Sequence, residues 1–211
     1  MAPCGIGEHT IHDRDGRIAA IAMAGIPRGS SEFSRMRGEA DRAKLERLME
    51  AIGERARGSG VVYLTGGATA LLFGWRQATI DVDIKPDPEP PGLFEAIAAL
   101  KESLDLNIEL ASPDQFIPTL PGWRDRSIFI ATHGPVSFYH YDLYSQALSK
   151  LQRGHARDLR DVDAMRSARL IEPAALARLF RDIQPQLIRF PAIDSATFER
   201  VVREFCEQGD G

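Results

Sequence analysis

Two hydrophobic periods run along the chain, and together they predict an α+β front half followed by a helical back half. Strands are expected where apolar and polar residues alternate or a short apolar run occurs, at 61–65, 79–85, 106–110, 127–134 and 136–143. Helices are expected where apolar residues recur every three or four positions or follow turn residues, at 37–60, 68–75 and 93–104. Gly134-Pro135 would turn the last two strands into a hairpin.

Beyond the last predicted strand, the pattern is helical throughout. Helices are predicted at 143–154, 155–168, 173–183 and 194–208. Pro173 would open the third of these, and Asp194 would cap the fourth. The chain is therefore expected to have three parts. These are a partly flexible N-terminal arm at 1–37 with one short strand near 18–23, an α/β core at 38–141, and a C-terminal helical lobe at 142–211.

The composition excludes several classes of protein, but it does not identify a function. A formal charge of −4 over 211 residues excludes a generally basic nucleic-acid coat and leaves room for a local basic groove. Cys4 and Cys206 lie at opposite ends of the chain, which argues against a disulfide scaffold and against a thiolate metal site. The apolar stretch at 18–26 is too short to cross a membrane and follows acidic residues, unlike a secretion signal. We expect a cytoplasmic bacterial protein with no membrane partner.

Candidate chemistry begins with acidic residues inside predicted strands. Asp81 and Asp83 lie at i and i+2 in 79–85 and project from one face, and Glu109 projects from a strand that can lie beside it. Like charges repel unless a cation lies between them, and three carboxylates suit Mg²⁺ or Mn²⁺ bound jointly with substrate phosphates. The alternative is a solvated strand face that carries charge for solubility.

A glycine pair upstream favours the metal-and-phosphate interpretation. Gly66 and Gly67 follow the predicted strand at 61–65 and precede a helix, so backbone N–H groups would be open to an anion, with Thr65 adding a hydroxyl contact. A tight turn that requires glycine for packing is the alternative. Arg76, just after this helix, could reach phosphate or face solvent.

The segment from Val61 to about Leu110, "TGGATALLFG" followed by "ATIDVDI", resembles the signature of the nucleotidyltransferase superfamily, which shares its fold with DNA polymerase beta. The resemblance implies a mixed sheet with flanking helices, an NTP substrate and bound metal ions. It further implies that Gly66 and Gly67 contact phosphates and that Asp81 and Asp83 bind metal. Glu109 would be the third carboxylate, where the family more often has Asp; Asp105 is the nearest acidic substitute.

The segment "LSKLQRGHARDLRDVDAM" (148–165) is similar to part of the AbiEii-type toxins and their uncharacterised bacterial relatives. On one continuous helix four charged residues would share a face, namely Lys150, Arg153, Arg157 and Asp161, with Asp158 beside them. A break of the helix at Gly154 would weaken this argument. Lys150 is conspicuous in a chain that otherwise favours arginine, and an ammonium suits a triphosphate oxygen or proton transfer. An exposed helix with an Arg157–Asp161 ion pair is the alternative.

The predicted activity is metal-dependent transfer of a nucleotide from an NTP to an acceptor. Asp81, Asp83, Glu109 and Lys150 are the expected catalytic residues, and the nucleotide would be bound by Thr65, Gly66, Gly67, Arg76, Arg153 and Arg157. An RNA such as tRNA, a protein and a small molecule all remain open as acceptors. The toxin resemblance implies a cognate antitoxin as partner. A catalytically degenerate module that binds a nucleotide or a protein partner is the competing interpretation.

Overall fold

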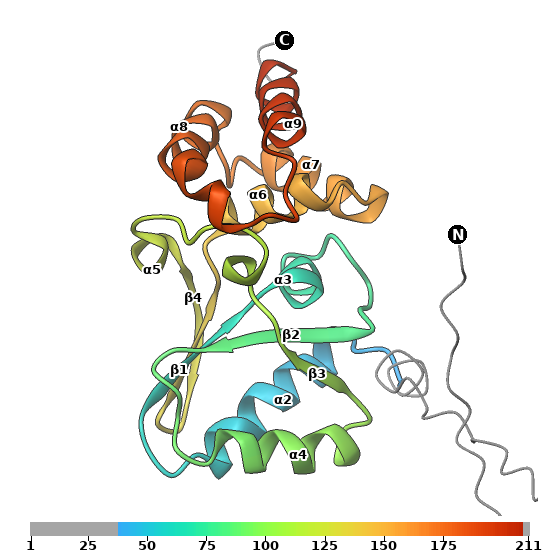
Figure 1. Cartoon of the computed structure of the whole chain (residues 1–211). Helices are drawn as coiled ribbons and strands as arrows, with labels where there is room; N and C mark the ends of the chain where they lie inside the picture. Colours follow the sequence, from blue (N-terminus) through green and yellow to red (C-terminus); the bar gives the residue numbers. More distant parts are fainter. Residues whose placement is uncertain (1–37, 209–211) are drawn as a thin grey trace, which may run out of the picture.

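A five-stranded sheet of order β3-β2-β1-β5-β4 organises the front half of the chain (Figure 1). Its strands are β1 (Gly60–Leu64), β2 (Asp81–Pro86), β3 (Asn107–Leu110), β4 (Ile128–His133) and β5 (Val136–His140). The central strand β1 pairs antiparallel with β2 and parallel with β5, β3 joins β2 in parallel, and β4 closes the hairpin with β5. The computed structural model describes residues 38–208, so the short strand predicted near residues 18–23 lies outside the described part.

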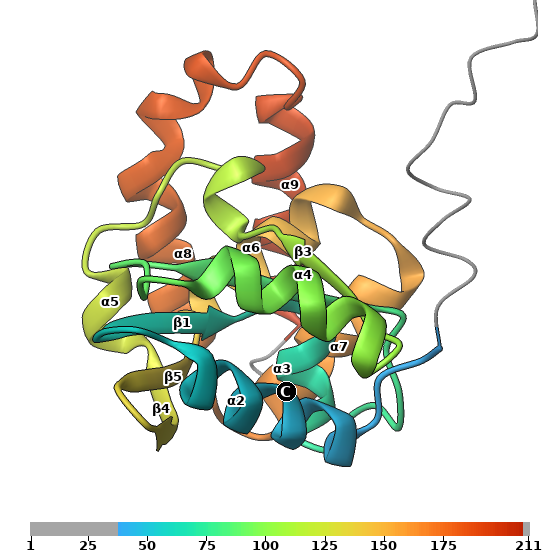
Figure 2. The ribbon, with the colours of Figure 1, turned by 90° about the horizontal axis from the view of Figure 1, so that it is seen from below.

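Helices cover both faces of this sheet. Helices α2 (Arg42–Arg55) and α4 (Leu93–Ser103) lie together under one face, as Figures 1 and 2 show. Helix α3 (Gly66–Leu72) packs against β2 on the other face, and the short α5 (Trp123–Arg126) precedes the hairpin. The predicted spacing in α2 is confirmed, because its apolar residues are buried, namely Leu45, Leu48, Met49 and Ile52. They join strand and α4 side chains in one hydrophobic cluster.

The back half is helical as predicted, with α6 (Leu143–Arg153), α7 (Ala156–Ser167), α8 (Pro173–Ile183), the 3-10 helix η2 (Gln184–Arg189) and α9 (Ser195–Glu207). Pro173 opens α8, and the Asp194 side chain accepts the Thr197 N–H at 2.7 Å to cap α9, as expected. None of the helices within residues 38–208 is long and apolar enough to cross a membrane.

The helical half has its own hydrophobic cluster, and a loop from the front half contributes to it. Ile117 and Leu120, which follow the 3-10 helix η1 (Pro113–Gln115), are buried among side chains of α6 to α9. The loop after β3 therefore runs from the sheet to the C-terminal helices and connects the two halves by packing. The division at residues 141 and 142 stays a prediction.

His140, at the end of β5, is buried between α3 and the sheet. Its Nδ1 lies 3.3 Å from Thr69 Oγ1, and its ring stacks on Phe73 at 4.4 Å between centroids. Burial disfavours the charged imidazolium and lowers the pKa of His140 to about 4. The folded protein therefore resists a proton that the unfolded chain accepts near pH 6.5.

Acidification is expected to destabilise the protein through His140. When the pH is lowered from 7.5 to 4.5, the unfolded state binds a proton at His140 and the folded state largely does not. The free energy of unfolding should therefore fall by about 2–3 kcal/mol. Urea unfolding at the two pH values would measure the loss in the wild type and in His140→Gln. The variant cannot take the proton, so its loss should be smaller by that amount. Equal losses would show that His140 does not carry this pH dependence.

Candidate active site

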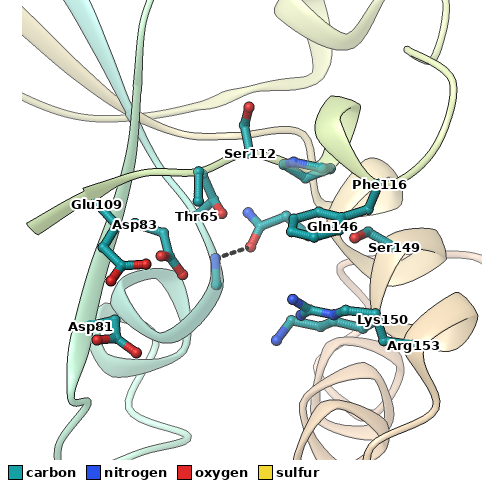
Figure 3. Close-up of a pocket in the computed structure, with 13 residues that line it drawn as sticks. Thr65, Asp81, Asp83, Glu109, Ser112, Phe116, Gln146, Ser149, Lys150 and Arg153 are labelled. Carbon is teal, nitrogen blue, oxygen red and sulfur yellow. Dashed lines mark hydrogen bonds between the residues drawn. The ribbon is translucent and has the colours of Figure 1, made fainter. Parts of the chain in front are cut away.

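Three carboxylates share one face of two neighbouring strands. In the parallel β2–β3 pair, Asp83 is in register with Glu109, and Asp81 is in register with Asn107. Side chains at i and i+2 of a strand and at its register partner point to the same side of the sheet. Asp81, Asp83 and Glu109 accordingly line one cavity of about 230 Å³, where Figure 3 shows them together on one side. The predicted juxtaposition of these three residues is present.

Asn107 is a member of this group that sequence reasoning missed. Its side-chain Nδ2 donates to Asp81 Oδ1 at 2.7 Å and to Glu109 Oε1 at 2.8 Å. One amide therefore bridges two carboxylates and fixes their separation. The alternation of 106–110 places Asn107 on the face of Glu109, and this signal could have identified it.

The electrostatics of the group favour a bound cation. Burial raises the pKa of Asp83 to about 6, and the neighbouring charges of Asp81 and Glu109 add to the shift, while Arg153 and Lys150 oppose it. Within residues 38–208, no three His, Cys, Asp or Glu side chains form a group that could hold a metal ion unaided. Mg²⁺ needs no such cage, since it binds through one or two carboxylates together with substrate phosphates and water. The hard oxygen donors of Asp81, Asp83 and Glu109 therefore fit a nucleotide-borne Mg²⁺ or Mn²⁺.

Gly66 begins α3 directly against Asp83. Its φ is +55°, and a Cβ at this position would lie 2.5 Å from Asp83 Oδ2, so a side chain here would strain the backbone and displace the Asp83 carboxylate. The Gly66 N–H donates to Gln146 Oε1 at 2.9 Å (Figure 3). A phosphate at this N–H, as the sequence predicts, would replace that bond.

Gln146 had no signal in the sequence, although it connects α6 to the start of α3. It is 2% exposed, and its Nε2 donates to Tyr141 O at 2.8 Å and to Thr69 Oγ1 at 3.2 Å. These bonds use both donors and the acceptor of the amide side chain. Gln146 is thus a fixed part of the cavity wall, supplied by the helical half.

Gly67 is held by packing against Thr79. A Cβ at Gly67 would overlap Thr79 Oγ1 and lie 2.8 Å from Thr79 Cβ. Thr79 cannot retreat freely, because its Oγ1 donates to Asp81 O at 3.1 Å and its backbone pairs with Ala40. This contact supports the alternative that a glycine is required here for packing, although Gly67 lies within α3 rather than in a turn.

Gly67→Ala is expected to destabilise the protein by about 1–3 kcal/mol through overpacking. Urea unfolding would measure this cost. The double variant Gly67→Ala/Thr79→Gly opens the space, so its cost should be clearly less than the sum of the two single costs. Additive costs, or a Gly67→Ala variant as stable as the wild type, would mean that the overlap with Thr79 is relieved some other way.

A second cavity of about 340 Å³ lies beside the first and holds most of the predicted phosphate contacts. Five residues line both cavities: Gly66, Asp81, Asp83, Lys150 and Arg153. The second cavity adds Gly67, Arg76, His155, Arg157 and Asp158, whereas Thr65, Glu109, Gln146 and Phe116 line only the first. The carboxylates therefore stand where two adjoining cavities meet, with cations from α6 and α7 opposite them.

The shared helical face of Lys150, Arg153, Arg157 and Asp161 required one continuous helix, and the structure does not meet this condition. Helix α6 ends at Arg153, Gly154 has a φ of +67°, and α7 starts at Ala156 in a new direction. This break brings α7 back against α6, so that Lys150 Nζ lies 2.6 Å from Asp161 Oδ2 and 3.1 Å from Asp158 Oδ1. Asp161 therefore pairs with Lys150 rather than with Arg157, whose Nη2 lies 3.4 Å from Ala78 O.

The remaining cations of the cleft are also held by aspartates. Arg76 makes a two-bond contact with Asp161, at 2.9 and 2.5 Å, and Arg153 Nη2 lies 3.1 Å from Asp158 Oδ1. Arg76 is therefore not a solvent-facing arginine. Its two bonds to Asp161 use Nε and Nη2, so Nη1 can still contact a phosphate in the second cavity. The network crosses from the loop after α3 to α6 and α7, and it fixes the basic wall of the cleft.

The other predicted positions are resolved by the same geometry. Thr65 is buried, follows β1 as the N-cap of α3, and lines the first cavity. Asp105, the alternative third carboxylate, accepts the Gly38 N–H at 3.0 Å and lines neither cavity. Glu109 is therefore the acidic residue that the fold places beside Asp83.

A family model described as "nucleotidyltransferase of unknown function (DUF6036)" matches residues 43–203. No curated protein and no solved structure matches the chain. The family match includes the five strands, both cavities and most of the helical half. With the carboxylates of β2 and β3 facing a basic wall across the glycine turn, the chain belongs to this nucleotidyltransferase family of unknown function.

Proposed function

We propose that the protein moves a nucleotide from an NTP to an acceptor hydroxyl in a metal-dependent reaction. The observation that carries this proposal is the placement of Asp81, Asp83 and Glu109 on one face of two paired strands, opposite Lys150 and Arg153 in the same cavity. Oxygen ligands on one side and cations on the other are what transfer of a phosphoryl group requires. The family indicates nucleotidyl transfer in general terms.

The charge balance of the cleft supports a need for metal. The cations Arg76, Lys150, Arg153 and Arg157 line the two cavities, together with Asp81, Asp83, Glu109 and Asp158. Asp161 adds a further negative charge to this wall through its bonds to Lys150 and Arg76. The cleft therefore carries no surplus of positive charge for an NTP polyanion. Binding would be favourable only when the nucleotide arrives with cations.

The chain's own residues would divide the reaction between them. Mg²⁺ or Mn²⁺ held by Asp81, Asp83 and Glu109 would neutralise phosphate charge and activate the attacking oxygen. The acceptor oxygen forms a bond to the α-phosphorus as the bond from that phosphorus to pyrophosphate breaks. Glu109 takes the hydroxyl proton, and the wall of Lys150, Arg153 and Arg157 receives the departing pyrophosphate.

The acceptor class is the open part of the proposal, and RNA such as tRNA, proteins and small molecules are its candidates. The similarity of residues 148–165 to AbiEii-type toxins motivates RNA as the first acceptor to test and a cognate antitoxin as partner. Incubation with Mg²⁺, each α-labelled NTP and separate RNA, protein and metabolite fractions would identify what becomes labelled. Pyrophosphate release that a chelator abolishes is expected. Metal-dependent binding without pyrophosphate release would instead identify a degenerate binding module.

A further inference from the structure

Phe116 is an aromatic residue that the hydrophobic clusters of the described chain leave out. It follows η1 as its C-cap, the residue is 39% exposed, and it lines the first cavity on the side opposite the carboxylates (Figure 3). Its neighbour Ile117 is fully buried among the helices. Ile117 therefore belongs to the core, whereas the ring of Phe116 lies at the rim of a polar cavity.

The position of Phe116 is fixed from both directions along the chain. On one side, Asp114 binds Lys85 Nζ at 2.6 Å and accepts the Ser112 hydroxyl. On the other side, Ile117 and Leu120 anchor the loop in the helical core. The ring itself lies against Arg153, whose Cζ is 5.2 Å from the ring centroid. A rigid aromatic surface at a cavity binds planar rings without an ordering cost.

We propose that Phe116, backed by Arg153, is the stacking surface for the nucleobase of the NTP. The inference rests on the proposed nucleotidyl transfer and specifies how its substrate lies. Every nucleobase has a π face, so an aromatic side chain can bind a base without reading its hydrogen-bonding edge. The hydroxyl of Ser149, a buried residue that lines the same cavity, is a polar group on α6 that the base or sugar can use.

The two cavities assign the base and the phosphates to different places. The first cavity, at about 230 Å³, is smaller than the roughly 300–1,000 Å³ typical of drug-sized ligands, so it suits part of a nucleotide. It contains the aromatic ring, whereas the second contains Arg76, His155 and Arg157. Because Lys150 and Arg153 line both, a nucleotide with its base on Phe116 would carry its phosphates past them toward the cations. The same path brings the phosphates beside Asp81 and Asp83.

The contributions of the base and of the phosphates to affinity can be separated by comparing the binding of ATP with that of inorganic tripolyphosphate. Both are measured with Mg²⁺ and without acceptor. Isothermal titration calorimetry should show that the wild type binds ATP more tightly than tripolyphosphate. Phe116→Ala should weaken ATP binding about tenfold to a hundredfold, the range for loss of one stacked base, and leave tripolyphosphate binding unchanged. Phe116→Trp should retain ATP binding. Phe94→Ala, at a similarly exposed phenylalanine on α4, is the matched control and should change neither affinity.

The outcomes distinguish this inference from the proposed function. If Phe116→Ala leaves ATP affinity unchanged, or weakens ATP and tripolyphosphate equally, the base does not stack on Phe116 and the nucleotidyl transfer proposal stands. Unchanged ATP affinity with lost transfer would assign the ring to the acceptor, which also overturns the inference. If the wild type binds neither ligand with Mg²⁺, both the inference and the proposed function fail.

Discussion

Asp83→Asn is expected to abolish Mg²⁺-dependent NTP turnover while leaving the protein folded and more stable at pH 8. Residues that only support a metal ligand cost about tenfold to a hundredfold when changed, so loss of a ligand itself should cost at least about a hundredfold. Asp81→Asn should also abolish turnover, because Asp81 lies on the same strand face as Asp83 and lines the same cavity. Pyrophosphate release at saturating NTP is the measurement.

The stability gain follows from the burial of Asp83 beside two like charges. Its pKa is raised to about 6, so the folded state binds a proton more readily than the unfolded state, and stability falls as pH rises through 6. Asparagine carries no charge, and at pH 8 the variant should unfold with a free energy higher by on the order of 1–3 kcal/mol. Asp182→Asn, at an exposed position on α8, should alter neither turnover nor stability. Wild-type turnover in both Asp81→Asn and Asp83→Asn would mean that the site has been misplaced.

Lys150→Met is expected to lower the unfolding free energy by about 1–3 kcal/mol, because two buried aspartates lose their shared cation and keep only Arg76 and Arg153 as partners. An exposed helical lysine would change stability by only about ±0.5 kcal/mol. Lys150 is instead 2% exposed, and Asp158 and Asp161 are buried with it. Urea unfolding would measure the difference. Lys101→Met, on the partly exposed α4, is the matched control and should stay within the smaller range.

Activity of the Lys150 variants must be read at a temperature where circular dichroism shows them folded. Turnover should fall in Lys150→Met, because Lys150 lines both cavities together with Asp83. Lys150→Arg keeps the charge in a space with little room, and it separates charge from shape. A folded Lys150→Met variant with wild-type turnover would reduce the lysine to a structural ion-pair partner. A variant as stable as the wild type would show that its ion pairs contribute nothing net.

Local patterns in the sequence were sufficient for the acidic half of the site. Period-two alternation at 79–85 and 106–110 places Asp81, Asp83 and Glu109 on strand faces, and strands of this length leave little freedom of register once one face is buried. The glycine pair was correctly placed after a strand, but the structure makes it the start of α3 rather than a turn that precedes the helix. Its two members differ in a way that only the fold shows, since Gly66 faces Asp83 and Gly67 faces Thr79.

The cations of the basic half were named from the sequence, but their pairing could not be predicted, because it depends on contacts between distant segments. Extending one helical period through Gly154 gave a common face that does not exist, and the true partner of Asp161 on the front half is Arg76. Gln146 and Phe116 carry no local signature either. A glutamine inside an amphipathic helix and a phenylalanine in a loop acquire their positions only when the helices pack on the sheet.

The pairing of β1 with β5 has a consequence for synthesis on the ribosome. The chain makes β1, β2 and β3 in order, yet the remaining edge of β1 stays open until Val136–His140 has been translated. Such a non-local parallel pairing slows folding, and an open edge in the middle of a future sheet is a template for wrong partners. The nascent front half should therefore be a target for chaperones that bind exposed strands. Translation pauses before β5 should lower the yield of folded protein more than pauses within α7 to α9.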